Sequence, residues 1–391
     1  MNSVEVGVTD ITKKKILYLV SSLNEGSGVM SYIMNLYRHI DNEKVQIDFL
    51  TAISKESRYE KELLDRGANI YHIPAPSKIG IRNYINYVER LDKFFSTQKN
   101  QYDVIHSHSP ILNFFHFPIA KKYGIKYRIV HSHSTKSSNR FLGKIRNFFL
   151  LSTLKKHANI YFACTEEAGE FLFGKKAMGE GKVHLINNGI DCDKFNFNPE
   201  TRAKVRKALK VNDKFVVGHV GRFANEKNHS FLIDTFVEIY KEKNNSVLVL
   251  AGDGELLDSL KEKVLRLGIK NNVLFLGSRN DINEIMQAMD VFILPSTFEG
   301  LGIVAIEAQA VGLPCYVSDR VPEAVGITEL VSHVSLKHSP KIWARQVLLD
   351  NLSNISRRSY IDEIKKNNYD VNDLSKWMET YYINLGKRNS M

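Results

Sequence analysis

The chain has 391 residues, of which 43% are hydrophobic and 25% are charged, and this length and composition are typical of a globular protein with about two domains. Its three cysteines are too few and too widely spaced for a disulfide framework, and no run of about 18 apolar residues predicts a membrane-spanning helix. Residues 1–12 also lack the pattern of a secretory signal, so we expect a cytoplasmic protein.

Positive charge is concentrated in the first half of the chain. The whole chain has a net charge of +11, and residues 1–190 hold 27 basic and 17 acidic residues, against 27 and 26 in the remainder. This asymmetry predicts a surface that faces an anionic partner, such as nucleic acid or membrane headgroups. Because the sequence has no zinc-finger spacing, homeodomain-like helix or RNP-type aromatic strand, we expect no nucleic-acid partner.

Short apolar runs alternate with longer amphipathic stretches along the chain, as in βα units around a parallel sheet. In the first half, with a helix from Gly28 to residue 39, the predicted strands are residues 15–21, 45–50, 69–73, 104–108, 128–131, 160–164 and 183–186. In the second half, with helices over 230–241 and 255–267, they are residues 215–220, 247–251, 273–276, 291–294 and 315–317. We therefore predict two successive α/β halves that meet within residues 187–199.

Two cations follow the first predicted strand of the second half. In open α/β sheets ligands bind beyond the carboxyl ends of the strands, and residues 215–220 run directly into Gly221 and Arg222, with Lys227 five residues further on. A planar guanidinium and a mobile ammonium at this spacing suit a diphosphate. The alternative is a solvated loop with ordinary surface charges.

Two glutamates follow the strand at residues 291–294. Glu299 is predicted to lie on a glycine-containing loop, and Glu307 in the helix that follows. Glycines allow close backbone approach, and the free N–H groups of a helix start form an anion site. Glu299 could instead cap the helix, but Glu307 lies among small and apolar residues, where an unpaired carboxylate is costly. We therefore expect Glu307 to bind a ligand.

These residues carry a resemblance. The sequence resembles the retaining GT-B glycosyltransferases of family 4, and most of all the bacterial capsular and exopolysaccharide members. The resemblance lies in Glu299 and Glu307, which have seven residues between them, and in the Gly221-Arg222 and Lys227-Asn228 pairs. Other segments agree, namely VGHVGR at 217–222, AGDG at 251–254, EAQAVGLP at 307–314 and NNGID at 187–191. The resemblance implies two Rossmann-like domains facing across a cleft: an acceptor domain at 1–190, a donor domain at 191–370, and a helix at 371–391 that returns to the first domain.

The resemblance also assigns roles to residues of the second half. It implies that Arg222 and Lys227 neutralise the donor diphosphate, Glu299 binds the sugar, Glu307 holds the ribose and Arg279 lies beside the base. It implies that the backbone of the glycine loop holds phosphate, at Gly221, Gly300, Leu301, Gly302 and Ile303. Nothing in the sequence resembles the Asp-x-Asp metal signature, so we expect no metal and no cofactor, with a nucleotide sugar, most simply a UDP sugar, as substrate.

The first half contributes a glycine turn and two His-x-His pairs. Gly28 in the turn would approach the donor phosphates or the acceptor. Residues i and i+2 of a strand share a face, so His106 and His108, like His131 and His133, would lie side by side. A metal site is one interpretation, although no carboxylate converges on it. The resemblance implies that His108 reaches the donor sugar; for His133 a similar position is expected, and for the other two, hydrogen-bonded packing.

Residues 136–157 contain basic residues and no acid around an apolar stripe. This pattern predicts a helix on an anionic membrane surface or one packed on its own sheet. In the helix predicted at 371–391, we expect Trp377 to pack within the protein rather than to bind a ligand.

Together these expectations describe a retaining hexosyltransferase. It would move a hexose or N-acetylhexosamine by front-face substitution from the nucleotide sugar to a lipid-linked saccharide acceptor, in cell-surface or exopolysaccharide biosynthesis at the inner face of the cell membrane. A nucleotide-sugar epimerase, a metal-dependent hydrolase and a non-catalytic nucleotide-sugar binder are alternatives. The sequence leaves the donor sugar, the linkage and the oligomeric state open.

Overall fold

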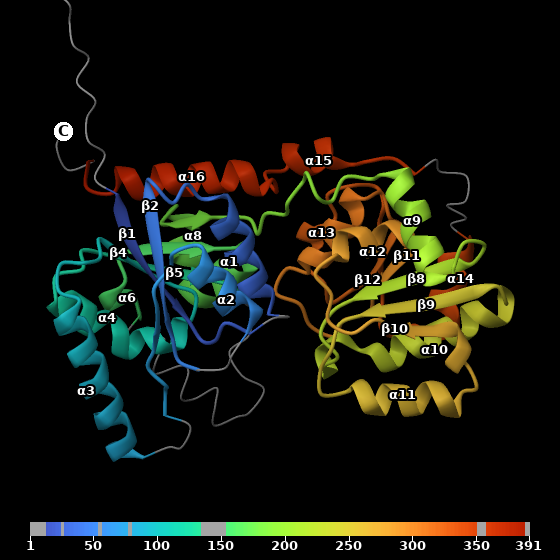
Figure 1. Ribbon diagram of the computed structural model, residues 1–391, viewed down its shortest axis with the longest axis horizontal. Coiled ribbons are helices and arrows are strands. Elements are labelled where there is room, and N and C mark those ends of the chain that lie inside the picture. Colours follow the sequence, from blue (N-terminus) through green and yellow to red (C-terminus); the bar gives the residue numbers. More distant parts are fainter. Residues whose placement is uncertain are drawn as a thin grey trace, which may run out of the picture.

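Figure 1 shows the computed structural model as two lobes side by side, each built around one parallel sheet. The structure describes residues 13–24, 27–53, 57–76, 80–133, 154–349 and 357–387. The basic segment singled out in the sequence falls largely on residues 134–153, outside this part of the chain, and Gly26 also lies outside it.

The amino-terminal lobe holds seven parallel strands in the order β3-β2-β1-β4-β5-β6-β7. Their central members are nearly continuous runs of buried residues, because helices cover both faces of the sheet; β4 and β5 end in buried histidine and serine. The strands are β1 (Lys14–Val20), β2 (Val45–Thr51), β3 (Ile70–His72), β4 (Val104–Ser107), β5 (Tyr127–Ser132), β6 (Ile160–Ala163) and β7 (Val183–Leu185). The helices are α1 (Gly28–His39), α2 (Arg58–Asp65), α3 (Ile81–Thr97), α4 (Asn113–Lys122), α6 (Leu154–His157), α7 (Glu166–Phe173) and α8 (Lys175–Gly179).

The carboxy-terminal lobe holds six parallel strands in the order β10-β9-β8-β11-β12-β13. The strands are β8 (Phe215–Val220), β9 (Ser246–Ala251), β10 (Val273–Phe275), β11 (Val291–Leu294), β12 (Cys315–Ser318) and β13 (Val331–Val334). The helices are α9 (Pro199–Leu209), α10 (His229–Glu242), α11 (Leu257–Arg266), α12 (Ile282–Ala288), α13 (Ile303–Ala310), α14 (Pro340–Leu349) and α15 (Ile361–Lys366). The helix that follows them, α16 (Val371–Asn384), packs on the amino-terminal lobe. The sequence did not predict β13, a partly exposed edge strand with a weak apolar pattern.

In both sheets the strand order reverses between the first strand and the fourth. The reversal lies between β1 and β4 in one lobe and between β8 and β11 in the other. Connections on the two sides of such a point leave in opposite directions and open a crevice at the carboxyl ends of the strands. The predicted residues after β4, β8 and β11 therefore belong at the places where this fold binds ligands.

The chain crosses between the lobes twice at one place. Ile190 and Asp370 form an isolated parallel bridge, with Ile190 entering the carboxy-terminal lobe and Asp370 leaving it. Helix α16 then packs against α1, and its side chains Met378 and Tyr382 are fully buried in the core of the amino-terminal lobe (Figure 1). Trp377, as expected, packs in this helix, stacked on Tyr381. The two Rossmann-like lobes and the returning helix confirm the predicted fold class.

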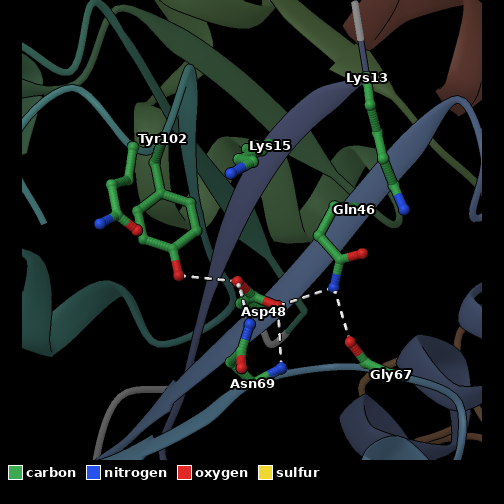
Figure 2. A pocket seen from close by; sticks show the side chains of 8 residues that line it. Lys13, Lys15, Gln46, Asp48, Gly67, Asn69 and Tyr102 are labelled. Atoms are coloured by element: carbon green, nitrogen blue, oxygen red, sulfur yellow. Dashed lines mark hydrogen bonds between the residues drawn. The ribbon is translucent and has the colours of Figure 1, made fainter.

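A pocket of about 250 Å³ lies at the opposite, amino-terminal edge of the first sheet (Figure 2). Its centre is the buried carboxylate of Asp48, which accepts hydrogen bonds from Gln46 Nε2 at 2.9 Å, from the Asn69 amide N–H at 2.9 Å and from Tyr102 Oη at 2.8 Å. These bonds join β2 to the segments that lead into β3 and β4. The network holds strands together, and it lies away from the crevice.

Candidate functional site

The loops that follow β8 and β11 are bound to each other. The Thr297 amide donates to the Glu226 carbonyl oxygen at 2.8 Å, and Asn228 Nδ2 donates to the Pro295 carbonyl oxygen at 3.1 Å. Asn228 has a left-handed backbone, with φ of 55°, which ends the short turn at Asn225–Lys227 and starts α10. The two loops therefore form one structural unit across the point where the strand order reverses.

Lys227 and Glu299, one from each loop, form an ion pair. Lys227 Nζ donates to Glu299 Oε1 at 2.6 Å, and Ser296 Oγ donates to the same oxygen at 2.7 Å. The Lys227 side chain is 19% exposed and that of Glu299 only 9% exposed. The Lys227 stem passes close to Gly221: a Cβ there would lie 3.5 Å from its Cδ and Cε, and 3.1 Å from His219 Nε2. The sequence predicted both charged residues but not their pairing, nor the role of Ser296.

Arg222, the second predicted cation, forms a more exposed ion pair. Arg222 Nη2 donates to Glu226 Oε1 at 2.7 Å, and the side chains are 50% and 40% exposed. The sequence analysis did not consider Glu226, although a spacing of four residues between opposite charges is a signal for such a pair. The guanidinium is thus held at the loop surface, where it is open to solvent.

Helix α13 starts directly after the Glu299 loop. Gly302 precedes it in a left-handed conformation, with φ of 86°. The amides of Ile303 and Val304 have no acceptor within the helix, whereas the Ala305 amide donates to the Gly302 carbonyl oxygen at 2.9 Å. Leu301 is buried in the core of the lobe and anchors the loop. A helix start of this kind can bind an anion, and a phosphate site here stays a prediction of the sequence.

Glu307 lies on the second turn of α13, half-buried among apolar neighbours. Burial raises the pKa of its carboxyl to about 8, and among the described residues no group donates a hydrogen bond to it. This shift favours the neutral carboxyl, which can both donate to and accept from a hydroxyl group. Arg279, which follows β10 at the same edge of the sheet, is exposed and pairs with Asp281 at 2.8 Å.

Three buried histidines and the half-buried His133 line the facing edge of the amino-terminal lobe. His106 and His108 belong to the end of β4, and His131 and His133 to the end of β5; their rings stack, with centroids 4.4 Å apart in the first pair and 4.1 Å in the second. His108 Nδ1 and His133 Nε2 are hydrogen bonded at 2.8 Å. Burial lowers the pKa of all four imidazoles, that of His133 to about 3, so this histidine wall is uncharged.

His106 and His131, the first histidine of each pair, differ in their hydrogen bonding. His106 Nδ1 is hydrogen bonded to the Tyr382 hydroxyl of α16 at 2.6 Å, and this hydroxyl also contacts Tyr18 Oη at 2.9 Å. The expectation of hydrogen-bonded packing is wrong for His131, because neither of its buried ring nitrogens has a hydrogen-bond partner. Its ring is held by stacking on His133 and by the edge of Tyr32, whose hydroxyl is also without a partner.

Three of these histidines are close enough to suggest a metal. One ring nitrogen from each of His106, His108 and His131 lies within 4.8 Å of the others. A metal needs lone pairs that converge on one point, but these rings are nearly parallel, with interplanar angles of 13° between His106 and His131 and 25° between His106 and His108. No carboxylate joins the group within the described part of the chain. The arrangement does not fit a metal-dependent hydrolase.

The two lobes meet at this wall. A Cβ on Gly300 would lie only 2.7 Å from the His133 carbonyl oxygen, so the glycine loop of one lobe touches the strand end of the other. At the rim, Arg58 on α2 donates to Ser278 Oγ at 3.4 Å. Gly28 is the first residue of α1, and a Cβ there would meet nothing within 4 Å. The predicted site residues thus gather on the facing edges of two lobes, with Gly28 in open space.

Sequence comparison now decides the family. Residues 26–194 match the model described as "Glycosyltransferase Family 4", and residues 200–346 match "Glycosyl transferases group 1". The chain belongs to the family 4 glycosyltransferases of GT-B fold. The glycosyltransferase is 34% identical over 356 residues to the putative glycosyltransferase EpsF of Bacillus subtilis, covering 90% of this chain and 91% of that protein.

Two other proteins extend this picture. A UDP-Gal:alpha-D-GlcNAc-diphosphoundecaprenol alpha-1,3-galactosyltransferase of Escherichia coli is 29% identical over 304 residues, or 75% of this chain and 76% of the relative. The crystal structure of HepE from Anabaena, in complex with UDP and glucose, superposes with a TM-score of 0.76 at 19% identity over 97% of this chain and 100% of HepE. In the part of the chain that the structure describes, the glycosyltransferase has no helix both long and apolar enough to span a bilayer.

Proposed function

We propose that the glycosyltransferase moves a hexose or N-acetylhexosamine from UDP to a lipid-linked saccharide, with retention of configuration and without a metal, at the inner face of the cell membrane in cell-surface or exopolysaccharide biosynthesis. The names of the relatives support the substrate classes: one acts on UDP-galactose and a diphosphoundecaprenol-linked acceptor, and another, 22% identical over 94% of this chain, is the capsular polysaccharide biosynthesis glycosyltransferase CapH of Staphylococcus aureus. HepE, of the same fold, was crystallised with UDP and glucose.

The observation that carries the proposal is the Lys227–Glu299 pair, at the point where the strand order of the second sheet reverses. Its ammonium and the neighbouring Arg222 supply fixed positive charge for a departing diphosphate. Glu299 keeps a second carboxylate oxygen to accept hydrogen bonds from sugar hydroxyls. The neutral histidine wall across the crevice offers ring nitrogens without partners to the sugar and the acceptor.

In the proposed reaction the bond between the anomeric carbon and the diphosphate oxygen breaks through an oxocarbenium-like state. The acceptor hydroxyl oxygen bonds to the same face of the anomeric carbon, and its proton passes to the departing phosphate oxygen. Lys227 and Arg222 stabilise the negative charge that develops on UDP, while Glu307 exchanges hydrogen bonds with the ribose hydroxyls and Arg279 lies beside the base. The amides at the start of α13 hold a phosphate.

Metal independence follows from the same charges in this proposal. Two fixed cations and a helix terminus provide the stabilisation that a divalent ion supplies in other transferases. We expect turnover to be unchanged by a chelator. Strict dependence on magnesium or manganese would contradict this part of the proposal.

The test is a panel of nucleotide sugars incubated with the purified protein, with and without a membrane lipid extract. We expect one UDP sugar to release UDP rapidly only with the extract, and NMR of the product to show the anomeric configuration of the donor. Conversion of the donor to an epimer without any acceptor would favour an epimerase. Binding of UDP with no consumption of any donor would identify a non-catalytic binder.

A further inference from the structure

His108 and His133 of the histidine wall are hydrogen bonded to each other through their rings. His108 Nδ1 lies 2.8 Å from His133 Nε2, and the planes of the two rings differ by 27°. The other nitrogen of each ring, Nε2 of His108 and Nδ1 of His133, is buried and has no hydrogen-bond partner among the described residues. We call these two atoms the outer nitrogens of the pair.

The protons of the two rings are coupled. Burial lowers the pKa of both imidazoles, that of His133 to about 3, so each ring is neutral and carries a single N–H. A hydrogen bond between two ring nitrogens needs one N–H and one lone pair, so one ring donates and the other accepts. The outer nitrogens then have opposite character, because one carries hydrogen whenever the other is bare. The tautomer of one histidine therefore fixes that of its partner.

The two possible arrangements of these protons are not equivalent. In the first, His133 Nε2–H donates to His108 Nδ1, and both rings carry their hydrogen on Nε2, the tautomer that a neutral histidine side chain prefers in water. In the second, both rings carry it on Nδ1, so both have the less favoured tautomer. Among the described residues, no hydrogen bond to an outer nitrogen opposes the first arrangement. We therefore expect the outer nitrogen of His108 to be an N–H donor.

The His133 ring is held firmly at the crevice end of its lobe. His108 directly follows β4 and His133 directly follows β5, at the carboxyl ends of the strands, and the His133 carbonyl oxygen is the atom that Gly300 approaches. The His133 ring stacks on His131, with centroids 4.1 Å apart, and contacts Tyr32 at 5.2 Å. A ring fixed by these contacts can hold its hydrogen-bond partner in one orientation.

We infer that His133 is a positioning residue, which holds His108 as the Nε2–H tautomer and so makes it a hydrogen-bond donor to an oxygen of the donor sugar. This inference rests on the proposed function, in which the histidine wall faces the sugar. Across the crevice the Glu299 carboxylate can only accept hydrogen bonds from the sugar. The sugar hydroxyls, which both donate and accept, would thus meet an acceptor on one lobe and a donor on the other.

The test compares two variants of the full chain at position 133. His133→Phe keeps an aromatic ring for stacking on His131 but has no N–H, whereas His133→Gln supplies an amide N–H for His108 Nδ1. Both variants keep the backbone carbonyl beside Gly300. We expect kcat for UDP release to fall about tenfold in His133→Phe, as for one hydrogen bond lost from the transition state, and to recover to within about threefold of the wild type in His133→Gln.

Two controls separate positioning from a general loss of structure. His116→Phe removes the ring hydrogen bonds of another buried histidine of the same lobe, to the Leu112 carbonyl oxygen at 2.6 Å and the Tyr87 hydroxyl at 3.3 Å, and should keep the kcat of the wild type. The affinity for UDP, measured by calorimetry, should be the same in all three variants, because UDP carries no sugar for His108 to contact.

Nitrogen-15 NMR of protein with labelled histidine shows the tautomer directly and requires no turnover. The signals of His108 are assigned by their loss in His108→Phe. We expect His108 to carry its hydrogen on Nε2 in the wild type and in His133→Gln, and to exchange between both tautomers in His133→Phe, where no group donates to its Nδ1.

An Nδ1–H tautomer of His108 in the wild type, or the same single tautomer in His133→Phe, would overturn the inference. A kcat of His133→Phe equal to that of the wild type, or no recovery in His133→Gln, would also count against it. If the wild type releases UDP from no nucleotide sugar, the proposed function fails, and the NMR spectra still decide whether His133 sets the tautomer of His108.

Discussion

The two walls of the crevice use opposite electrostatics. On the carboxy-terminal side, Lys227 and Arg222 are charged, and each is paired with a carboxylate of its own lobe. On the amino-terminal side, the histidine wall is neutral, and several buried ring nitrogens have no partner. Charge lies where a diphosphate would bind, and neutral donors and acceptors lie where sugar hydroxyls would. Under the proposed function, leaving-group stabilisation would fall to one lobe and substrate positioning to the other.

Removing the central charge of the carboxy-terminal wall should have the largest effect. Lys227→Ala should lower kcat about 100–1,000-fold, the usual cost of losing one preorganised group that stabilises developing charge. The change in kcat is measured as the rate of UDP release at a saturating concentration of the donor. Lys263→Ala, which breaks a 2.7 Å pair with Asp234 on the outer helices of the same lobe, should leave kcat unchanged. A rate near that of the wild type for Lys227→Ala would remove leaving-group stabilisation from this wall.

Acidic pH should lower the free energy of unfolding of the amino-terminal lobe more than that of the carboxy-terminal lobe. Burial holds the pKa of all four wall histidines below the value of about 6.5 in unfolded chains, and that of His133 at about 3. As pH falls below 6.5 the unfolded chain takes up protons that the folded lobe does not. Each histidine then lowers the free energy of unfolding by about 1.4 kcal/mol per pH unit, until its folded pKa is reached.

Each lobe holds one of the two tryptophans, Trp377 in the first and Trp343 in the second. Urea unfolding at pH 7.5, 6 and 5, followed in Trp343→Phe and Trp377→Phe variants, reports the lobes separately. We expect the Trp377 signal to lose stability more steeply, although the second lobe also contains two buried histidines, His219 and His229. An equal pH dependence of stability for the two lobes would show that the histidine wall does not make the amino-terminal lobe more sensitive to acid.

Disturbing the contact between the two walls of the crevice should lower kcat moderately. In Gly300→Ala the new methyl group would meet the His133 carbonyl oxygen at 2.7 Å, so the loop must move by several tenths of an ångström. We expect kcat to fall about tenfold, because small misplacements of reacting groups are costly. Gly179→Ala, on an exposed turn of α8 with no atom within 4 Å of the new Cβ, is the control. Full activity of Gly300→Ala would mean that this contact is not needed for turnover.

The smallest effect is expected at Glu226. Glu226→Gln removes the carboxylate that holds Arg222, while the backbone carbonyl that binds Thr297 stays. UDP affinity measured by calorimetry should rise about two- to fivefold, the range for an exposed ion pair. Weaker binding would indicate that the pair orients Arg222 instead of competing for it.

The sequence predicted the sheets and the charged residues better than the relations between them. Continuous apolar runs identified twelve of the thirteen strands, because parallel strands buried on both faces leave a strong pattern. The positions of Arg222, Lys227 and Glu299 followed from their places after β8 and β11. Which carboxylate pairs with which cation did not, since pairing depends on loop conformation. The contact of Gly300 with His133 depends on how the lobes meet, and no local pattern encodes it.

His131 shows a further limit. The sequence places it on a strand face beside His133, where a hydrogen-bond partner is the usual expectation for a buried imidazole. In the folded lobe its neighbours are the rings of His106, His133 and Tyr32, so stacking replaces hydrogen bonding. Only the three-dimensional arrangement of β4, β5 and α1 brings these rings together.

The path of α16 has a consequence for synthesis on the ribosome. Because Met378 and Tyr382 lie in the core of the lobe that is made first, that lobe stays incomplete until α16 has been translated. The nascent amino-terminal lobe must wait, partly open, while the second lobe emerges and folds. A nonsense mutation just before α16 would therefore leave the core of the amino-terminal lobe incomplete, although every strand of that lobe would have been made.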